Sequence, residues 1–261
     1  DWKRKALFNL RWQELSSEEY VLCPPLVLIG SEEMLAGPGL GQLTWLLNSR
    51  LPVKVLVLQS LDFGIAGDHL SQLAQSPVND PRTSLALLAL TQRNAYVAQT
   101  SVADSAHFCD SVLGALRYRG PALIQAYAPL PSQHGFASEL STQQAALAVR
   151  SRTMPVYRYD PSADGVFGSR ISLEGNPQPA GLLTDGSDGD RPLTPADLAL
   201  GQQRFKFAFA PLPSDAKAPV PLHEWLQLAN SERMHKTPYL ARDDDEQRLA
   251  MSPALIDTAV N

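Results

Sequence analysis

Cysteine is scarce in this chain of 261 residues and occurs only as Cys23 and Cys109. The two lack the spacing of a metal site, and in a chain of this size they are typical of reduced thiols in a cytosolic protein. The chain also lacks an apolar run of about 18 residues, so we expect no membrane-spanning helix. Its first residues do not have the pattern of a secretory signal peptide. We therefore expect a cytoplasmic location.

Charge of either sign is modest, because charged residues make up 19% of the chain and the formal net charge is −5. Acidic residues are scattered, which argues against a nucleic-acid partner. No zinc, P-loop or dinucleotide-binding signature occurs. Gly30-Ser31-Glu32 is not a nucleophile elbow, because the pattern Gly-x-Ser-x-Gly is incomplete. We therefore assign no catalytic residue.

Apolar residues make up 44% of the chain and alternate between strand-like runs and helical periods. Short apolar runs bounded by Gly, Pro or Ser predict strands, and the segments between them have helical spacing. This alternation predicts an α/β fold with a mainly parallel sheet and helices on both faces. The predicted strands are 26–29, 53–59, 95–100, 122–128 and 154–159, and the helices are 38–48, 83–92, 104–119 and 141–152.

The composition changes after residue 160, where Gly, Pro, Ser and Asp become frequent. Helices are predicted from Pro195, near 221–228 and from Pro253. We therefore divide the chain into an N-terminal segment 1–19, an α/β domain 20–160 and a Pro-rich, partly helical C-terminal extension 161–261. Because the sequence starts at Asp1, we expect it to be a piece of a longer polypeptide.

Two turns that follow predicted strands are candidates for a binding site. The first is Gly30-Ser31-Glu32-Glu33, ahead of a helix, and the second contains Gly67. Ligands of open parallel sheets bind at the carboxyl ends of strands. A diphosphate with Mg²⁺ needs oxygen ligands and backbone groups near a helix start.

Further segments match one known family in the same order along the chain. They are Leu22–Gly30, Gly39–Gly41, Val53–Leu58, Tyr96–Thr100, Arg119–Pro129, His134–Gly135, Pro155–Pro161, Thr194–Asp197, Arg204–Phe205, Glu224–Leu226 and Lys236–Tyr239. Residues 20–160 resemble the thiamine-diphosphate-binding portion of pyruvate:ferredoxin/flavodoxin oxidoreductases, and the later segments resemble their long fused relatives. The resemblance implies the thiamine-diphosphate-binding fold and oxidative decarboxylation of a 2-oxoacid.

The resemblance also implies where the cofactor and its Mg²⁺ would lie. The family's Gly-Asp-Gly falls on 31–33 and its Asn-Thr-Gly-Gly on 65–68. Glu32 is then the implied metal ligand. The implied cofactor-binding residues are Gly30, Ser31, Glu32, Glu33, Gly67, Asp68 and His69.

Several of these positions depart from the family's pattern. Glu32 is longer than Asp, Glu33 replaces a Gly and Ile65 has no oxygen to offer. Leu130 stands where the family has a cysteine that binds an iron–sulfur cluster, so we expect no cluster in this chain. Impaired or lost binding of thiamine diphosphate and magnesium is therefore expected.

Other interpretations of single residues remain open. Glu32 is also explained as an exposed or helix-capping acid, which is favourable at a helix N-terminus. His69 could contact an anion or be solvated, and His134 could be functional or simply an ordered loop residue. Cys109 lies with Leu113 and Leu116 on an apolar helix face, which predicts core packing, and Cys23 is predicted to be a packed thiol.

Two functions remain in view, and the sequence leaves open whether the chain is an enzyme. It is either a cofactor-binding domain of a 2-oxoacid oxidoreductase or a non-catalytic structural or assembly module of a larger oxidoreductase-like complex. The resemblance implies as partners the rest of a larger oxidoreductase polypeptide or its subunits, and a possible homodimer. We expect neither nucleic acid nor a membrane as a partner.

Overall fold

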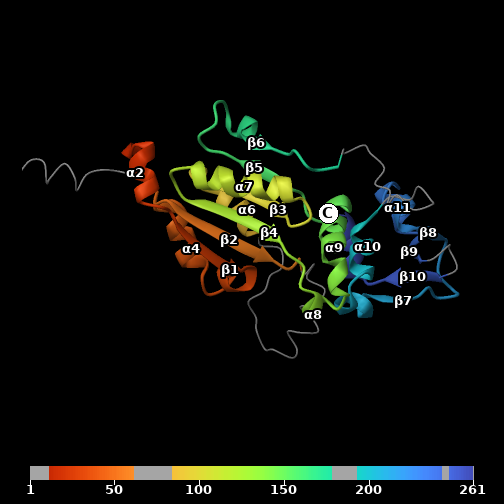
Figure 1. Cartoon of the computed structure of the whole chain (residues 1–261). Helices are drawn as coiled ribbons and strands as arrows, with labels where there is room; N and C mark the ends of the chain where they lie inside the picture. Colours follow the sequence, from red (N-terminus) through yellow and green to blue (C-terminus); the bar gives the residue numbers. More distant parts are fainter. Residues whose placement is uncertain (1–11, 62–83, 178–192, 243–246, 261) are drawn as a thin grey trace, which may run out of the picture. The chain divides into compact units, whose positions relative to one another are not determined.

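The computed structural model describes residues 12–61, 84–177, 193–242 and 247–260. The chain forms two compact units that are interleaved in the sequence (Figure 1). The first unit comprises Asp1–Gln59, Thr83–Tyr127 and Val156–Gly175. The second comprises Ser60–Arg82, Ala128–Pro155 and Asn176–Asn261.

The first unit is built on a six-stranded sheet with the order β1-β2-β4-β3-β5-β6. The first four strands in this order are parallel, whereas β5 and β6 run antiparallel to their neighbours. The prediction of a mainly parallel sheet is therefore confirmed. The strands are β1 (Leu26–Ser31), β2 (Val53–Gln59), β3 (Tyr96–Ser101), β4 (Ala122–Tyr127), β5 (Tyr157–Tyr159) and β6 (Ile171–Ser172).

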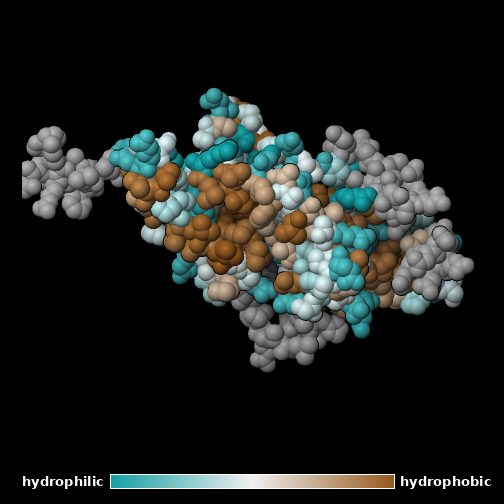
Figure 2. All heavy atoms as spheres, viewed as in Figure 1, coloured by the Kyte–Doolittle hydropathy of each residue, from teal (hydrophilic) through white to brown (hydrophobic). Residues whose placement is uncertain are grey.

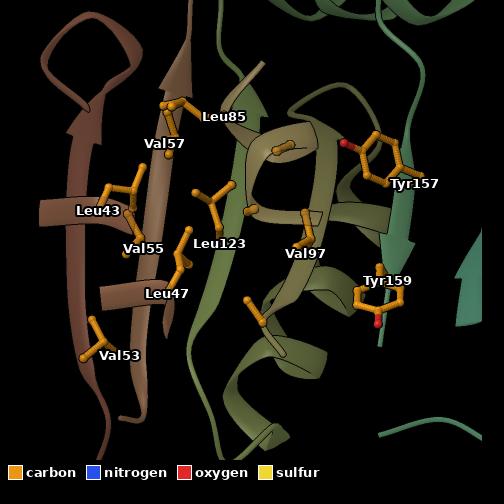
Figure 3. Close-up of a cluster of buried hydrophobic side chains, with 13 residues drawn as sticks. Leu43, Leu47, Val53, Val55, Val57, Leu85, Val97, Leu123, Tyr157 and Tyr159 are labelled. Atoms are coloured by element: carbon orange, nitrogen blue, oxygen red, sulfur yellow. The ribbon is translucent and has the colours of Figure 1, made fainter. Parts of the chain in front are cut away.

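Helices pack on both faces of this sheet. On one face, α4 and α6 bury leucines and alanines against alternate residues of the strands, such as Val55 and Val57 of β2 (Figure 3). On the other face, α7 packs on β3 and β4 through Ala115. The helices are η1 (Trp12–Glu14), α2 (Ser17–Leu22), α3 (Glu32–Ala36), α4 (Leu40–Asn48), α6 (Leu85–Thr91), α7 (Ser105–Arg117) and η3 (Phe167–Arg170).

The face of α7 that packs on the sheet is not the apolar stripe predicted from the sequence. The helix buries His107, Ser111 and Ala115, whereas Cys109 is exposed and Leu113 is 46% exposed. The prediction that Cys109 lies in the core is therefore wrong, and so is the prediction of a packed thiol for Cys23, which is also exposed. Small side chains face the sheet because the helix lies close to it, and a Cβ on Gly114 would come within 2.4 Å of the hydroxyl of Tyr96.

The central strands β3 and β4 of the sheet are completely buried, whereas the edge strand β1 is largely exposed. Every residue of β3 and β4 is buried. In β1, by contrast, Leu26 and Ile29 are 60% and 67% exposed, and Val27 and Leu28 between them are also exposed. Figure 2 shows a broad hydrophobic area over β1 and β2. The described residues therefore leave an apolar strand uncovered at this edge.

The second unit combines short helices with a small sheet of order β7-β10-β9-β8. The helices predicted from Pro195 and Pro253 are present, and the one predicted near 221–228 is shorter than expected. The sheet was not predicted, and its two edge strands, with three residues each and proline in both, show no alternating pattern. The strands are β7 (Phe209–Pro211), β8 (Pro219–Pro221), β9 (Thr237–Arg242) and β10 (Gln247–Met251), and the helices are α8 (Pro131–His134), η2 (Ser138–Leu140), α9 (Ser141–Arg150), α10 (Pro195–Leu200), η4 (Gln203–Ala208), α11 (Leu222–Trp225), α12 (Asn230–Arg233) and α13 (Pro253–Val260).

The core of the second unit joins these helices to the sheet. Phe205 of η4 is fully buried with Leu240 of β9 and Leu255 of α13. None of the helices in the described parts of the chain is long and apolar enough to cross a membrane.

Two leucines on α6 test the packing of the first unit. Leu85 is fully buried, whereas Leu87, two positions along the same helix, is 55% exposed. We expect Leu85→Ala to lower the free energy of unfolding by about 2–5 kcal/mol, because truncation leaves a cavity against the sheet. Leu87→Ala serves as the matched control and is expected to cost less than about 1 kcal/mol. Denaturant unfolding measures both, and equal losses would contradict this packing.

Candidate functional site

The structure places the first predicted turn at the carboxyl end of β1. Gly30 and Ser31 are the last residues of β1, and Glu32 and Glu33 form the first turn of α3. The carboxyl end of the neighbouring parallel strand β2 lies beside this turn, since Ser31 is in register with Leu58. The other predicted site residues, Gly67, Asp68 and His69, lie outside the described residues, as does Ile65.

The residues around Glu32 in the first turn serve the local structure. Ser31 is the N-cap of α3, and its Oγ accepts a hydrogen bond from the backbone N–H of Met34 at 3.4 Å. Gly30 lies against the side chain of Leu35, which would be 3.2 Å from an added Cβ. Glu33 is exposed. The turn therefore begins α3 and seats it on β1.

The half-buried Glu32 is joined to the centre of the sheet by a buried glutamine. Gln125 lies in β4, is completely buried, and donates a hydrogen bond from Nε2 to Oε1 of Glu32 at 3.0 Å. Its Oε1 accepts a hydrogen bond from the backbone N–H of Ala86 at 2.7 Å. One amide thus connects the turn after β1 with the first turn of α6. A buried amide needs such partners, because leaving either end unpaired costs free energy.

This arrangement limits what Glu32 can do as a ligand. Mg²⁺ is usually bound through one or two carboxylates together with phosphate oxygens. A metal ion at Glu32 would share the carboxylate with the Gln125 amide, which donates its hydrogen bond to Oε1. Within the described ranges, no group of three or more His, Cys, Asp or Glu side chains could hold a metal ion.

Gln125 is not among the site residues predicted from the sequence. The available signal was a single polar residue inside the apolar run of 122–127, which belongs to a strand buried on both faces. A glutamine in that position must have a hydrogen-bond partner. The partner itself could not be named from the sequence, because Glu32 lies 93 positions away.

His134 lies in the second unit and is buried rather than exposed. It is the last residue of α8, and its Nδ1 accepts a hydrogen bond from the backbone N–H of Leu130 at 3.3 Å. Burial, with a smaller contribution from the charge of Arg204, lowers the pKa of His134 to about 4. The imidazole is therefore neutral near pH 7. His134 is therefore an ordered residue, but at the end of a short helix and not in the predicted loop.

Arg204, next to this histidine in the second unit, holds the segment that follows β2. Its guanidinium donates hydrogen bonds to the carbonyl oxygens of Ser60 and Leu61 at 2.9 and 2.8 Å. It also donates to Oε1 of Gln202, whose own amide donates to Gln144 on α9. The chain immediately before the second predicted turn is therefore fixed by a partly buried polar network.

The sequence of this chain is similar to parts of much longer oxidoreductases. No protein-family model matches it. It is 29% identical over 154 residues to the pyruvate:ferredoxin oxidoreductase of Moorella thermoacetica, covering 55% of this chain and 13% of that protein. It is 26% identical over 186 residues to the pyruvate-flavodoxin oxidoreductase of Rhodospirillum rubrum, covering 67% and 15%. It is also 29% identical over 138 residues to the sulfite reductase [NADPH] subunit beta of Saccharomyces cerevisiae, covering 52% and 9%.

These matches support a distant, partial relationship with the pyruvate:ferredoxin and pyruvate-flavodoxin oxidoreductases, and hence an oxoacid oxidoreductase-like domain. The chain spans at most about a seventh of the length of the relatives named above. Metal binding by Glu32 and cofactor binding by the other predicted residues stay predictions.

Replacing Gln125 tests the bridge between Glu32 and α6. Gln125→Met keeps the length of the side chain but removes both hydrogen bonds, so we expect a loss of about 1–3 kcal/mol in the free energy of unfolding. The matched control is Gln42→Met on α4, which changes an exposed glutamine. Denaturant unfolding compares the two, and an equally small effect of both substitutions would show that the bridge contributes nothing.

His134 should make the second unit sensitive to acid. The pKa of His134 is about 4 in the folded chain and has an ordinary value of 6.5, so the unfolded state binds more protons between these values. Stability therefore falls as the pH is lowered from 6.5 to 4, and this residue accounts for about 3 kcal/mol of the fall. We expect His134→Asn, which can still accept from the N–H of Leu130, to lose less stability over this range. The exposed His235→Asn is the control, and identical pH profiles for the wild type and His134→Asn would refute the assignment.

Proposed function

We propose that this chain is a domain of a pyruvate oxidoreductase-like protein that keeps the α/β sheet of a thiamine-diphosphate-binding domain but binds thiamine diphosphate and magnesium weakly or not at all. The observation that carries the proposal is the hydrogen bond from the buried Gln125 amide to the carboxylate of Glu32. Relatives named for pyruvate oxidation support the first part of the proposal.

The loss of cofactor binding follows from competition for the same polar groups. A hydrogen bond to a charged group is worth about 1.5–3 kcal/mol, and displacing Glu32 would also leave the Gln125 amide buried without that partner. Ser31 is likewise engaged, because its hydroxyl caps α3. A diphosphate with Mg²⁺ would therefore compete with contacts that hold α3 and α6 to the sheet.

A second candidate function is a non-catalytic structural or assembly module of a larger oxidoreductase-like complex in the cytoplasm. Two observations favour it. The apolar strand β1 is exposed, as expected of a surface that contacts other polypeptide. The matched relatives are also named for two different reactions, pyruvate oxidation and sulfite reduction. A role in assembly would account for similarity to both, with the rest of a larger polypeptide or its subunits as partners.

Calorimetric titration with thiamine diphosphate, with and without Mg²⁺, tests the proposal. We expect the wild-type chain to give no saturable, Mg²⁺-dependent heat. The informative variants are Glu32→Gln and, as a matched control on the adjacent exposed position, Glu33→Gln. Mg²⁺-dependent binding by the wild type that is lost in Glu32→Gln but kept in Glu33→Gln would overturn the proposal and establish Glu32 as a metal ligand.

A restored variant shows whether the side chains at the two turns are the cause. Glu32→Asp, Glu33→Gly and Ile65→Asn together reproduce the residues that the family has at these positions. Binding by this triple variant alone would show that the fold is competent and that these substitutions abolished binding. If the triple variant also fails to bind, the cause lies elsewhere in the chain or in a missing partner domain.

A further inference from the structure

A buried histidine in the first turn of α7 has one ring nitrogen without a partner. His107 is 6% exposed, and its Nδ1 lies 2.9 Å from Oγ1 of Thr100, a completely buried residue near the carboxyl end of β3. The other nitrogen, Nε2, is also buried and has no hydrogen-bond partner among the described residues. A buried polar group without a partner costs free energy. This nitrogen is therefore a feature that the local packing does not explain.

The edge of the ring that carries Nε2 is covered by a segment from far along the chain. A Cβ built on Gly175 would lie 3.5 Å from Cδ2 of His107, the carbon bonded to Nε2, and 3.1 Å from Cγ2 of Val156. Gly175 has a φ of +97°, which residues with a Cβ rarely adopt. The backbone of the segment 173–175 therefore closes against the imidazole in a conformation that suits glycine.

This contact lies where the chain enters and leaves the first unit. Residues 156–175, which we call the arm, contain β5 and β6 and are preceded and followed in the sequence by residues of the second unit. Tyr157 and Tyr159 of β5 are buried in the core. The segment 173–175 follows β6, which has only two residues, and all three of its own residues are exposed. Core burial therefore secures the start of the arm but not its end.

Charged side chains surround the imidazole on the elements packed against it. Nη1 of Arg158 in β5 lies 3.6 Å from Oδ2 of Asp110 in α7, and its Nη2 lies 3.1 Å from Oε2 of Glu174. Asp104, the N-cap of α7, accepts a hydrogen bond from the backbone N–H of His107 at 2.9 Å. The strands β3 and β4 carry no charged residue. Burial, followed by the positive charge of Arg158, lowers the pKa of His107, and the three carboxylates oppose this effect.

We propose that His107 is an acid-sensitive latch for the end of the arm: the neutral imidazole allows the segment 173–175 to close against it, and protonation of the imidazole releases the segment. A protonated imidazole has an N–H on both nitrogens. The hydroxyl of Thr100 can accept from Nδ1–H, whereas Nε2–H would be a charged, buried donor without an acceptor. Opening of the segment gives this N–H water as a partner and removes the cost of burying the charge.

The direction of the pH effect follows from linkage. The pKa of His107 is lowered in the closed form from its ordinary value of 6.5, so the open form binds more protons and closure weakens as the pH falls below 6.5. Between pH 7.5 and 5.5 the opening constant rises at most about tenfold, which is the limit for a closed form that takes up no proton. Because Asn176 belongs to the second unit, release frees a stretch of chain that connects the two units.

Hydrogen–deuterium exchange of the full chain, read by mass spectrometry and corrected for the intrinsic effect of pH, tests the latch. From pH 7.5 to 5.5 we expect exchange in the segment 173–175 to rise by about three- to tenfold, while β4 stays protected. His107→Asn keeps an amide beside Thr100 but cannot take up the proton, so the rise should vanish. His134→Asn, which removes a buried imidazole from the second unit, is the matched control and should keep the rise. No rise in the wild type, or a rise that persists in His107→Asn, would overturn the proposal.

A charge variant separates the histidine from the ion pair at the end of the arm. Glu174→Gln removes the ion pair with Arg158, so we expect faster exchange of the segment 173–175 at both pH values and an acid response that remains. If the response is instead lost in Glu174→Gln and kept in His107→Asn, the carboxylate is the sensor and the proposal is wrong.

The reciprocal measurement follows the imidazole and needs no substitution of His107. Gly175→Val disfavours the closed segment, because a β-branched residue is strained at this φ. By linkage, the midpoint of the His107 titration, measured by NMR, should then rise toward 6.5. Gly168→Val, also in the arm but with open space around the added Cβ, is the matched control. An unchanged midpoint in Gly175→Val would contradict the latch. None of these experiments involves Glu32 or a cofactor, so this proposal and the proposed function can fail separately.

Discussion

The first unit depends on the burial of its central strand on both faces. Every residue of β4 is buried, so the one polar side chain in it, Gln125, must find its hydrogen bonds inside the protein. It finds them at Glu32, after β1, and at the backbone of Ala86, in α6. A single amide therefore links three segments that are distant in the sequence, and the position of the first turn follows from this requirement.

One cation in each unit, the buried Lys54 and the half-buried Arg204, donates its hydrogen bonds to backbone carbonyl oxygens. Lys54 of β2 is 3% exposed and donates hydrogen bonds to the carbonyl oxygens of Tyr118 and Gly120, beyond the end of α7. Burial lowers the pKa of Lys54 to about 8. Arg204 binds two carbonyl oxygens after β2 in the same way. These side chains fix chain segments near the ends of strands, which is a structural use of charge rather than a catalytic one.

The two functional proposals concern two different parts of the same strand. At its carboxyl end, β1 leads into a turn whose Ser31 and Glu32 already have hydrogen-bond partners within the chain. Along its length, β1 presents apolar side chains and an open backbone edge. Ser31 and Glu32, where the resemblance predicts a cofactor, have hydrogen-bond partners within the chain. The apolar side chains along β1 are exposed instead of packed against other residues. This combination is the reason that assembly is an alternative to catalysis as a role for the chain.

The sequence by itself determined the parallel sheet and most helices of the first unit, because runs such as Val53–Leu58 and caps such as Ser84 act over a few residues. It also placed Gly30 to Glu33 at the end of a strand. Only the tertiary structure decided that Glu32 meets Gln125, that α7 buries Ser111 rather than Cys109, and that the second unit contains a sheet. Each of these outcomes depends on contacts between distant segments, where the space available and the need to pair buried polar groups override the local pattern.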